Sequence, residues 1–169
     1  ERWTNQTTGE IHWRSIGRDN STTVYGRTAN ARIADPTQPL RVFEWLTERQ
    51  YDDKGNYIQY IYKPEDAAGF APQKCHNTNR RDAAGNITYT NRYLQRVLYG
   101  NRTPYTPVQR AQQQPYAGDF FFETVFDYGE FDQTSPWLPP GNRPWNCRPD
   151  AFSIFRAGFE VRTTRLCRR

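Results

Sequence analysis

The chain has 169 residues, the size of one ordinary domain, and its 5 Trp, 11 Tyr and 10 Phe offer enough aromatic surface for a core although only 29 residues are Leu, Ile, Val or Phe. The net charge of +5 comes from 20 Arg and 3 Lys against 18 acidic residues, and because the two signs are interleaved along the chain we expect no nucleic-acid binding. No apolar run approaches the length of a transmembrane helix, so we expect a single folded domain over residues 1–169 without a membrane-spanning segment.

Alternation of apolar and polar residues predicts β-strands from the N-terminal end onward. The first two strands are expected at residues 10–16 and 22–25. The clearest unit runs from residue 42 to residue 63, where two alternating segments flank the turn Asp52-Asp53-Lys54-Gly55-Asn56. Gly55 stands where a type I turn followed by a bulge requires a positive φ. This segment therefore predicts a β-hairpin.

The same turn pattern returns 30 residues later as Asp82-Ala83-Ala84-Gly85-Asn86 and predicts a second, degenerate copy that leads into a strand at residues 87–89. Residues 91–99 carry apolar side chains on both faces, which predicts a strand inside the sheet that is covered on both sides. Further strands are expected at residues 120–128 and 159–167.

Proline-rich segments separate several of these strands. Because proline lacks the amide proton, residues 35–39, 106–116 and 135–149 are expected to form surface loops. Windows with helical periodicity are scarce. The predicted fold class is therefore all-β, an antiparallel sheet of hairpins with long Pro-rich surface loops.

Three cysteines lie 72 and 20 residues apart, which is neither a disulfide framework nor a metal-binding spacing. They are Cys75, Cys147 and Cys167. We expect inert, buried thiols rather than a zinc site or a catalytic pair of Cys and His.

Two other groups of polar side chains are candidates for chemistry. His12 shares a strand face with one acidic and one basic residue, which favours an ion-paired or solvent-facing imidazole. Asp127, Glu130 and Asp132 could bind calcium if a turn brings them together, but a solvated loop is the simpler interpretation. The sequence contains no phosphate-binding loop, nucleophile elbow or His-Glu-x-x-His motif. We therefore expect no catalytic residues, no cofactor and no metal.

A series of segments, in order along the chain, resembles the blocks of one known family. The segments are Gly9-Glu10-Ile11-His12-Trp13-Arg14-Ser15-Ile16, Arg32-Ile33-Ala34-Asp35-Pro36, Tyr51-Asp52-Asp53-Lys54-Gly55-Asn56, Tyr99-Gly100-Asn101-Arg102-Thr103-Pro104-Tyr105, Phe126-Asp127-Tyr128-Gly129-Glu130 and Phe155-Arg156-Ala157-Gly158-Phe159-Glu160-Val161-Arg162-Thr163. The family is the SpvB type, which comprises the N-terminal domain of the virulence plasmid B protein and the B component of insecticidal toxin complexes (Tc toxins). Residues 137–149 resemble it least.

The resemblance implies a fragment of a larger, secreted toxin-complex subunit. In Tc toxins the B component joins the C component in a hollow β shell built partly of Rhs/YD-type hairpins, and the turn at Asp52 is similar to a YD-repeat turn. The expected partners are other toxin-complex subunits or the remaining segments of its own full-length chain. The virulence plasmid member also carries a separate ADP-ribosyltransferase domain with a Glu-x-Glu pair, which this sequence lacks, so we expect no enzyme activity.

A binding module is the alternative function. Aromatic side chains exposed on a β surface could hold carbohydrate or a protein partner, and the candidates are Trp3, Trp137 and Trp145. If the strand at residues 159–167 normally pairs with residues beyond the end of this chain, it presents an unpaired edge, and we expect self-association through that edge.

Overall fold

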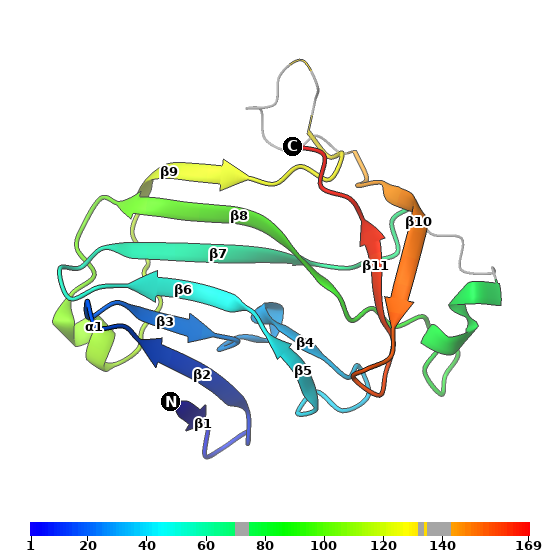
Figure 1. The fold of residues 1–169 in the computed structure, drawn as a ribbon, viewed down its shortest axis with the longest axis horizontal. Coiled ribbons are helices and arrows are strands. Elements are labelled where there is room, and N and C mark those ends of the chain that lie inside the picture. The colour runs from blue at the N-terminus through cyan, green and yellow to red at the C-terminus, as the bar shows by residue number, and fades with distance from the viewer. Residues whose placement is uncertain (70–74, 132–133, 135–142) are drawn as a thin grey trace.

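The computed structural model describes residues 1–69, 75–131, 134 and 143–169. Most of its strands form one antiparallel sheet, and they are β1 (Arg2–Thr4), β2 (Ile11–Ile16), β3 (Thr22–Tyr25), β6 (Thr47–Tyr51), β7 (Tyr57–Pro64), β8 (Arg92–Asn101) and β9 (Phe120–Val125). The seven strands follow one another in the order β1-β2-β3-β6-β7-β8-β9 (Figure 1). The predicted all-β, antiparallel fold class is confirmed.

Two smaller sheets complete the fold. One pairs β4 (Arg32–Ala34) with β5 (Val42–Trp45), and the other pairs β10 (Cys147–Ile154) with β11 (Val161–Arg165). Figure 1 shows β10 and β11 at one end of the large sheet, running across its strand direction, and the short helix α1 (Pro107–Ala111) at the opposite end. Two short 3-10 helices are η1 (Ala29–Ala31) and η2 (Cys75–Arg80). In the described ranges, no helix has the length and apolar character needed to cross a membrane.

The predicted hairpin is confirmed as β6 and β7. Tyr51 pairs with Tyr57, and the Asp52 carboxylate between them accepts hydrogen bonds from the backbone N–H groups of Lys54 at 3.0 Å and Asn56 at 2.9 Å. Gly55 has a φ of 93°, as the turn requires. The strand before the turn is shorter than expected, because residues 42–45 leave the large sheet and pair with β4 instead.

The second turn forms without the strand predicted after it. Asp82 accepts hydrogen bonds from the N–H groups of Ala84 and Asn86, both at 2.9 Å, and Gly85 has a φ of 84°. Only a single bridge joins Arg81 to Ile87, so the expected strand at residues 87–89 is wrong. The Thr88 N–H continues this pairing to the Arg80 carbonyl at 2.7 Å, but Arg80 is the last residue of the 3-10 helix η2, so no strand precedes it to extend the ladder.

Strand β8 lies between β7 and β9, so its interior position in the sheet is confirmed. Cover on both faces is found only near its start, where Tyr93 is buried, whereas Tyr99 near its end is 39% exposed. The strands expected near residues 10–16, 22–25, 120–128 and 159–167 are present as β2, β3, β9 and β11.

Two of the predicted Pro-rich loops contain regular structure. Residues 106–116 include α1, because Thr106 caps the helix with Pro107 at its first turn, where a missing N–H costs nothing. Pro149 lies inside β10, at an irregularity in the pairing with β11 that spares it a ladder hydrogen bond. Residues 135–142 of the third segment lie outside the described residues.

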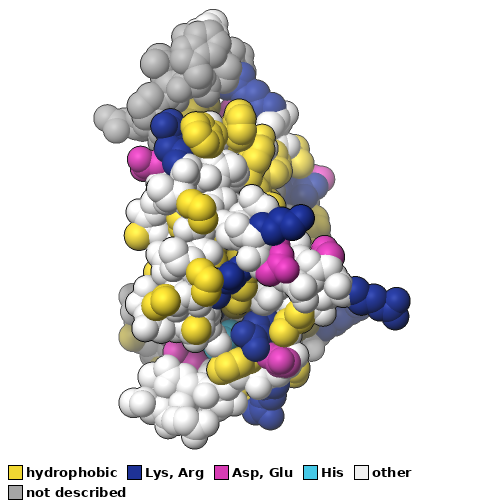
Figure 2. Space-filling view, turned by 90° about the vertical axis from the view of Figure 1, so that its left-hand side faces the viewer, with side chains coloured by type: hydrophobic (Ala, Val, Ile, Leu, Met, Phe, Trp, Pro, Cys, Tyr) yellow, Lys and Arg dark blue, Asp and Glu magenta, His cyan; other side chains and the backbone are white. Residues whose placement is uncertain are grey.

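The core is built of aromatic rings, as the composition predicts. One buried cluster contains Val24, Tyr51, Tyr57, Tyr105 and Tyr116, and a second contains Tyr93, Tyr128 and Trp145. The second cluster lies where the β10–β11 sheet meets the large sheet. On the face seen in Figure 2, basic and acidic side chains lie interspersed among hydrophobic ones.

Candidate functional site

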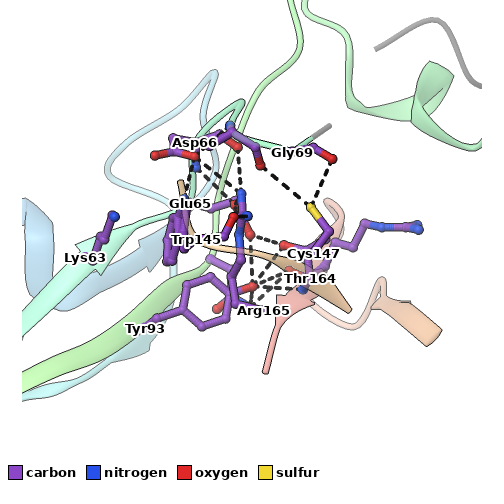
Figure 3. Close-up of polar contacts among 12 residues, drawn as sticks. Lys63, Glu65, Asp66, Gly69, Tyr93, Trp145, Cys147, Thr164 and Arg165 are labelled. Carbon is purple, nitrogen blue, oxygen red and sulfur yellow. Dashed lines mark hydrogen bonds and ion pairs between the residues drawn. The ribbon is translucent and has the colours of Figure 1, made fainter. Parts of the chain in front are cut away.

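A buried ion pair joins the two sheets. Glu65 follows the last residue of β7, and Arg165 is the last residue of β11. Their ion pair measures 2.5 Å between Arg165 Nη2 and Glu65 Oε1, and the side chains are 0% and 1% exposed (Figure 3). Arg165 also donates to the backbone oxygen of Trp145 at 2.9 Å. The guanidinium therefore links the end of β11 to two other segments of the chain.

Trp145 lies between two cations in this cluster. Arg165 Cζ and Lys63 Nζ each lie 4.1 Å from its ring centroid, and its Nε1 donates to Asp66 Oδ1 at 2.7 Å (Figure 3). Lys63 also forms an ion pair with Glu130. Because Trp145 is only 1% exposed, the expectation that it presents a ring to a partner is wrong. It packs edge-on against neighbouring tyrosines and serves the core.

The hydroxyl of Tyr93 links the cluster to β11. It accepts a hydrogen bond from the backbone N–H of Thr164 at 2.9 Å and donates to Glu65 Oε2 at 3.0 Å. Burial raises the pKa of Tyr93, and the charge of Glu65 raises it further. The phenol therefore stays protonated and available as a donor at neutral pH.

The outer edge of β11 is covered by side chains from the residues around the start of β8. Thr90 Oγ1 donates to the Glu160 carbonyl at 2.8 Å, and Asn91 Nδ2 donates to the Arg162 carbonyl at 3.0 Å. The Tyr93 hydroxyl accepts from the Thr164 N–H, so side chains bind the backbone at every second residue of this edge, from residue 160 to residue 164. Side chains therefore cover the edge that was expected to be unpaired at residues 159–167, and self-association of the protein stays a prediction.

The acidic turn after β9 binds its own backbone. Asp127 Oδ1 accepts from the N–H groups of Gly129 at 2.7 Å and Glu130 at 3.0 Å, and Asp127 Oδ2 accepts from Arg169 Nε at 2.9 Å. Burial opposes ionisation, but the hydrogen bonds and the Arg169 charge prevail and lower the pKa of Asp127. Asp132 lies outside the described residues. Among the described residues, no group of three His, Cys, Asp or Glu is arranged to hold a metal ion.

A separate pocket lies at the N-terminal edge of the large sheet, with a volume of about 420 Å³. His12 lines it and stacks with Trp3, with ring centroids 6.2 Å apart. Burial and the charges of Arg27 and Arg49 lower the pKa of His12 to about 4, so the imidazole is neutral at pH 7. Of the two alternatives expected for it, the ion pair is therefore excluded, and the side chain is half-buried rather than fully open to solvent. Trp3 is 38% exposed, as predicted, whereas Trp137 lies outside the described residues.

The three cysteines are thiols and form no disulfide within the described residues, and two of them are more accessible than expected. Cys75 and Cys167 are exposed, which corrects the expectation of buried thiols, and Cys147 is half-buried. Burial raises the pKa of Cys147, and its thiol points to the carbonyl oxygens of Ala68 and Gly69. A raised pKa favours an unreactive thiol.

The arrangement around Glu65 is suited to holding segments together. Glu65 and Arg165 are paired with each other, and the Trp145 ring is buried, so none of these side chains is open to a substrate. Sequence reasoning missed Glu65, Arg165 and Lys63, because each is an ordinary charged residue in its own segment. The only local signal is a short run of aromatic and charged residues at the end of β7.

Over residues 1–169 the chain matches the family described as SpvB, Salmonella virulence plasmid 65kDa B protein. The chain belongs to this family. It is 32% identical over 171 residues to the Mono(ADP-ribosyl)transferase SpvB of Salmonella typhimurium, and the alignment covers 99% of the chain and 28% of that protein. The SpvB-family chain thus spans little more than a quarter of the length of that relative.

Solved structures place this SpvB-family fold in two settings. The N-terminal domain of the effector protein SpvB from Salmonella typhimurium strain LT2 matches with a TM-score of 0.81 and 31% identity, over 99% of this chain and 51% of that one. A crystal structure of TcdB2-TccC3-TEV matches with a TM-score of 0.78 and 34% identity, over 99% of this chain and 8% of that one. The Photorhabdus luminescens Tc holotoxin pore matches with a TM-score of 0.74 at 34% identity, over 99% of this chain and 8% of that one.

Proposed function

We propose that this chain is a non-catalytic structural module of a secreted bacterial toxin, part of the β shell that encloses the toxic C component and helps to deliver it. The observation that carries the proposal is the match of the whole chain, at 34% identity, to a small part of TcdB2-TccC3 structures. A segment that covers 8% of so large a chain contributes to an assembly rather than acting alone.

The contacts between the two sheets support a role as a rigid part of a shell. The seven-stranded sheet has a second sheet fastened across its end by the Glu65–Arg165 ion pair and by the Tyr93 hydroxyl. Buried ion pairs add little net stability compared with apolar packing, but they require one arrangement of the segments that they join. Such a geometric constraint is what a fixed piece of a container needs.

A chimera tests the proposal. The 169 residues replace the matching segment of TcdB2, and the chimera is combined with TccC3. We expect the two to co-purify, and we expect the C-terminal region of TccC3 to resist an added protease to the same extent as in a parallel sample prepared with unchanged TcdB2. A folded chimera that binds TccC3 but leaves that region open to the protease would contradict the proposed enclosing role.

A second chimera serves as the matched control. It carries Arg148→Met, which removes an exposed ion pair with Asp150 and leaves the buried cluster intact. Because an exposed pair contributes little stability, this chimera should protect TccC3 as well as the first one does.

A further inference from the structure

The pocket at the N-terminal edge of the sheet has an unbalanced positive charge. Arg27 lines it, and its guanidinium donates from Nη1 to Gln113 Oε1 at 2.6 Å. Arg49 lies directly behind, only 3% exposed, and donates to the backbone oxygens of Gln113 and Gln114, both at 3.2 Å. Within the described ranges no carboxylate lies within ion-pair distance of either guanidinium, and Arg49 Nε has no hydrogen-bond partner.

The nearby acidic groups do not neutralise this charge by direct contact. Glu10 is paired with Arg32 at 3.0 Å, so these two charges cancel at the pocket wall. Glu48 attracts Arg27 from a greater distance while its Oε2 accepts from the Thr28 N–H at 2.9 Å. Repulsion between buried cations is costly, and an anion bound in the pocket would relieve it.

The remaining walls have the chemistry of a sugar site. Trp3 contributes an aromatic ring, and the side-chain amides of Asn5, Gln112 and Gln113 lie along the wall. Their oxygens already accept hydrogen bonds from Thr7, Gln114 and Arg27, so the amide N–H groups are what they offer to sugar hydroxyls. A pocket with an aromatic wall and a few placed polar groups is typical of small-molecule sites. The volume of about 420 Å³ is larger than an inorganic ion needs and suits one or two sugar rings. Figure 2 views the α1 end of the molecule, where hydrophobic and basic side chains lie close together.

We propose that this pocket binds an acidic sugar unit, with the sugar carboxylate on the Arg27 guanidinium and the hydroxyls on the surrounding amides. A planar guanidinium matches a carboxylate through two parallel hydrogen bonds, which favours a carboxylate over a neutral sugar. The proposal is independent of the shell function, because it rests on the walls of this pocket alone.

The imidazole of His12 reports on binding. Its pKa of about 4 reflects burial and the charges of Arg27, Arg49 and Arg32. Glu10 is the acidic residue in the lining of the pocket, and it is paired with Arg32. A carboxylate beside Arg27 would offset these positive charges and raise that pKa. The chain has two histidines, so a His76→Asn variant assigns the signal of His12 in an NMR titration.

The experiment titrates the protein with N-acetylneuraminic acid and with galacturonic acid, with galactose and inorganic phosphate as the comparison ligands. We expect at least one acidic sugar to shift the His12 signal in a saturable way and to raise its pKa. Arg27→Gln should weaken that binding by about tenfold or more, the loss expected for one charged hydrogen bond. The matched control Arg18→Gln changes an exposed arginine outside the pocket and should leave binding unchanged.

Three results would overturn the proposal. They are equal binding of galactose, binding of phosphate as tight as that of either acidic sugar, and no response of His12 to any of the four ligands. If Arg27→Gln does not fold, Trp3→Ala is the second variant, because Trp3 lies on the edge strand β1 and is 38% exposed. Loss of sugar binding by Trp3→Ala supports the site, and unchanged binding contradicts it.

Discussion

Glu65 and Arg165 form an ion pair of 2.5 Å although they stand 100 residues apart and have almost no exposed surface. The pair therefore fastens the end of β11 to the segment that leaves β7. Since both charges are cut off from water, each depends on the other for its stabilisation. This dependence makes the junction of the two sheets sensitive to the loss of either partner.

Arg165→Met should lower the free energy of unfolding by about 3–5 kcal/mol, because it leaves Glu65 buried without its partner. Urea unfolding followed by tryptophan fluorescence measures the change. The matched control is Arg148→Met, which breaks the exposed ion pair with Asp150 and should cost far less stability than Arg165→Met does. Equal losses in the two variants would mean that the buried pair has no special role.

Tyr93→Phe should cost about 1–3 kcal/mol, because it removes the hydroxyl that serves both the Thr164 N–H and the Glu65 carboxylate. The ring stays, so packing against Trp145 is preserved and the loss reports on the hydrogen bonds. Chemical denaturation measures it, with Tyr99→Phe at an exposed position as the control. A loss no greater than that of the control would show that water replaces the missing hydroxyl.

Gly55→Val should destabilise the hairpin more than Gly85→Val does. Both glycines have a positive φ, of 93° and 84°, so both substitutions carry backbone strain of about 1–3 kcal/mol. At Gly55 the added Cβ would also meet Pro104 Cβ at 3.0 Å and the Tyr105 nitrogen at 3.2 Å, whereas it would meet nothing within 4 Å at Gly85. Thermal unfolding compares the two variants, and equal melting temperatures would show that the contact with Pro104 adjusts freely.

Acid should weaken the protein through His12 before its carboxylates are protonated. The folded-state pKa of about 4 lies below the ordinary value of 6.5, so the unfolded chain binds more protons between these two pH values. The stabilisation is complete above pH 6.5 and is lost as the pH falls toward 4. After allowance for solvent screening it amounts to about 1 kcal/mol.

The measurement for this prediction is urea unfolding of the protein and of His12→Gln at pH 7 and pH 4.5. We expect a smaller acid-induced loss in the variant. If the two proteins lose the same stability over that range, the imidazole is not neutral at its buried position.

Most of the fold could be predicted from interactions between residues that are close in the sequence. Asp52 and Gly55 lie within one turn, and their side-chain hydrogen bonding and backbone freedom act over a few residues, which is why the hairpin could be predicted from the sequence. The alternation of β8 and the aromatic composition of the core are likewise local properties. The turn at Asp82 shows where local prediction fails. Its hydrogen bonds form as expected, but within the described part of the chain only one bridge, between Arg81 and Ile87, follows from it, and no strand forms.

The family, the all-β class, the turns and the aromatic nature of the core can be predicted from the sequence, because they follow from residues close together in the chain or from ordered blocks along it. Tertiary structure alone decided that Trp145 is enclosed between Lys63 and Arg165 and that side chains from residues 90–93 cover the edge of β11. It also decided that Arg27 and Arg49 share one region in which no carboxylate of the described residues forms an ion pair with either. The physical reason is that burial and electrostatic pairing depend on distances in space, and the sequence around a residue does not show which distant residue it will contact.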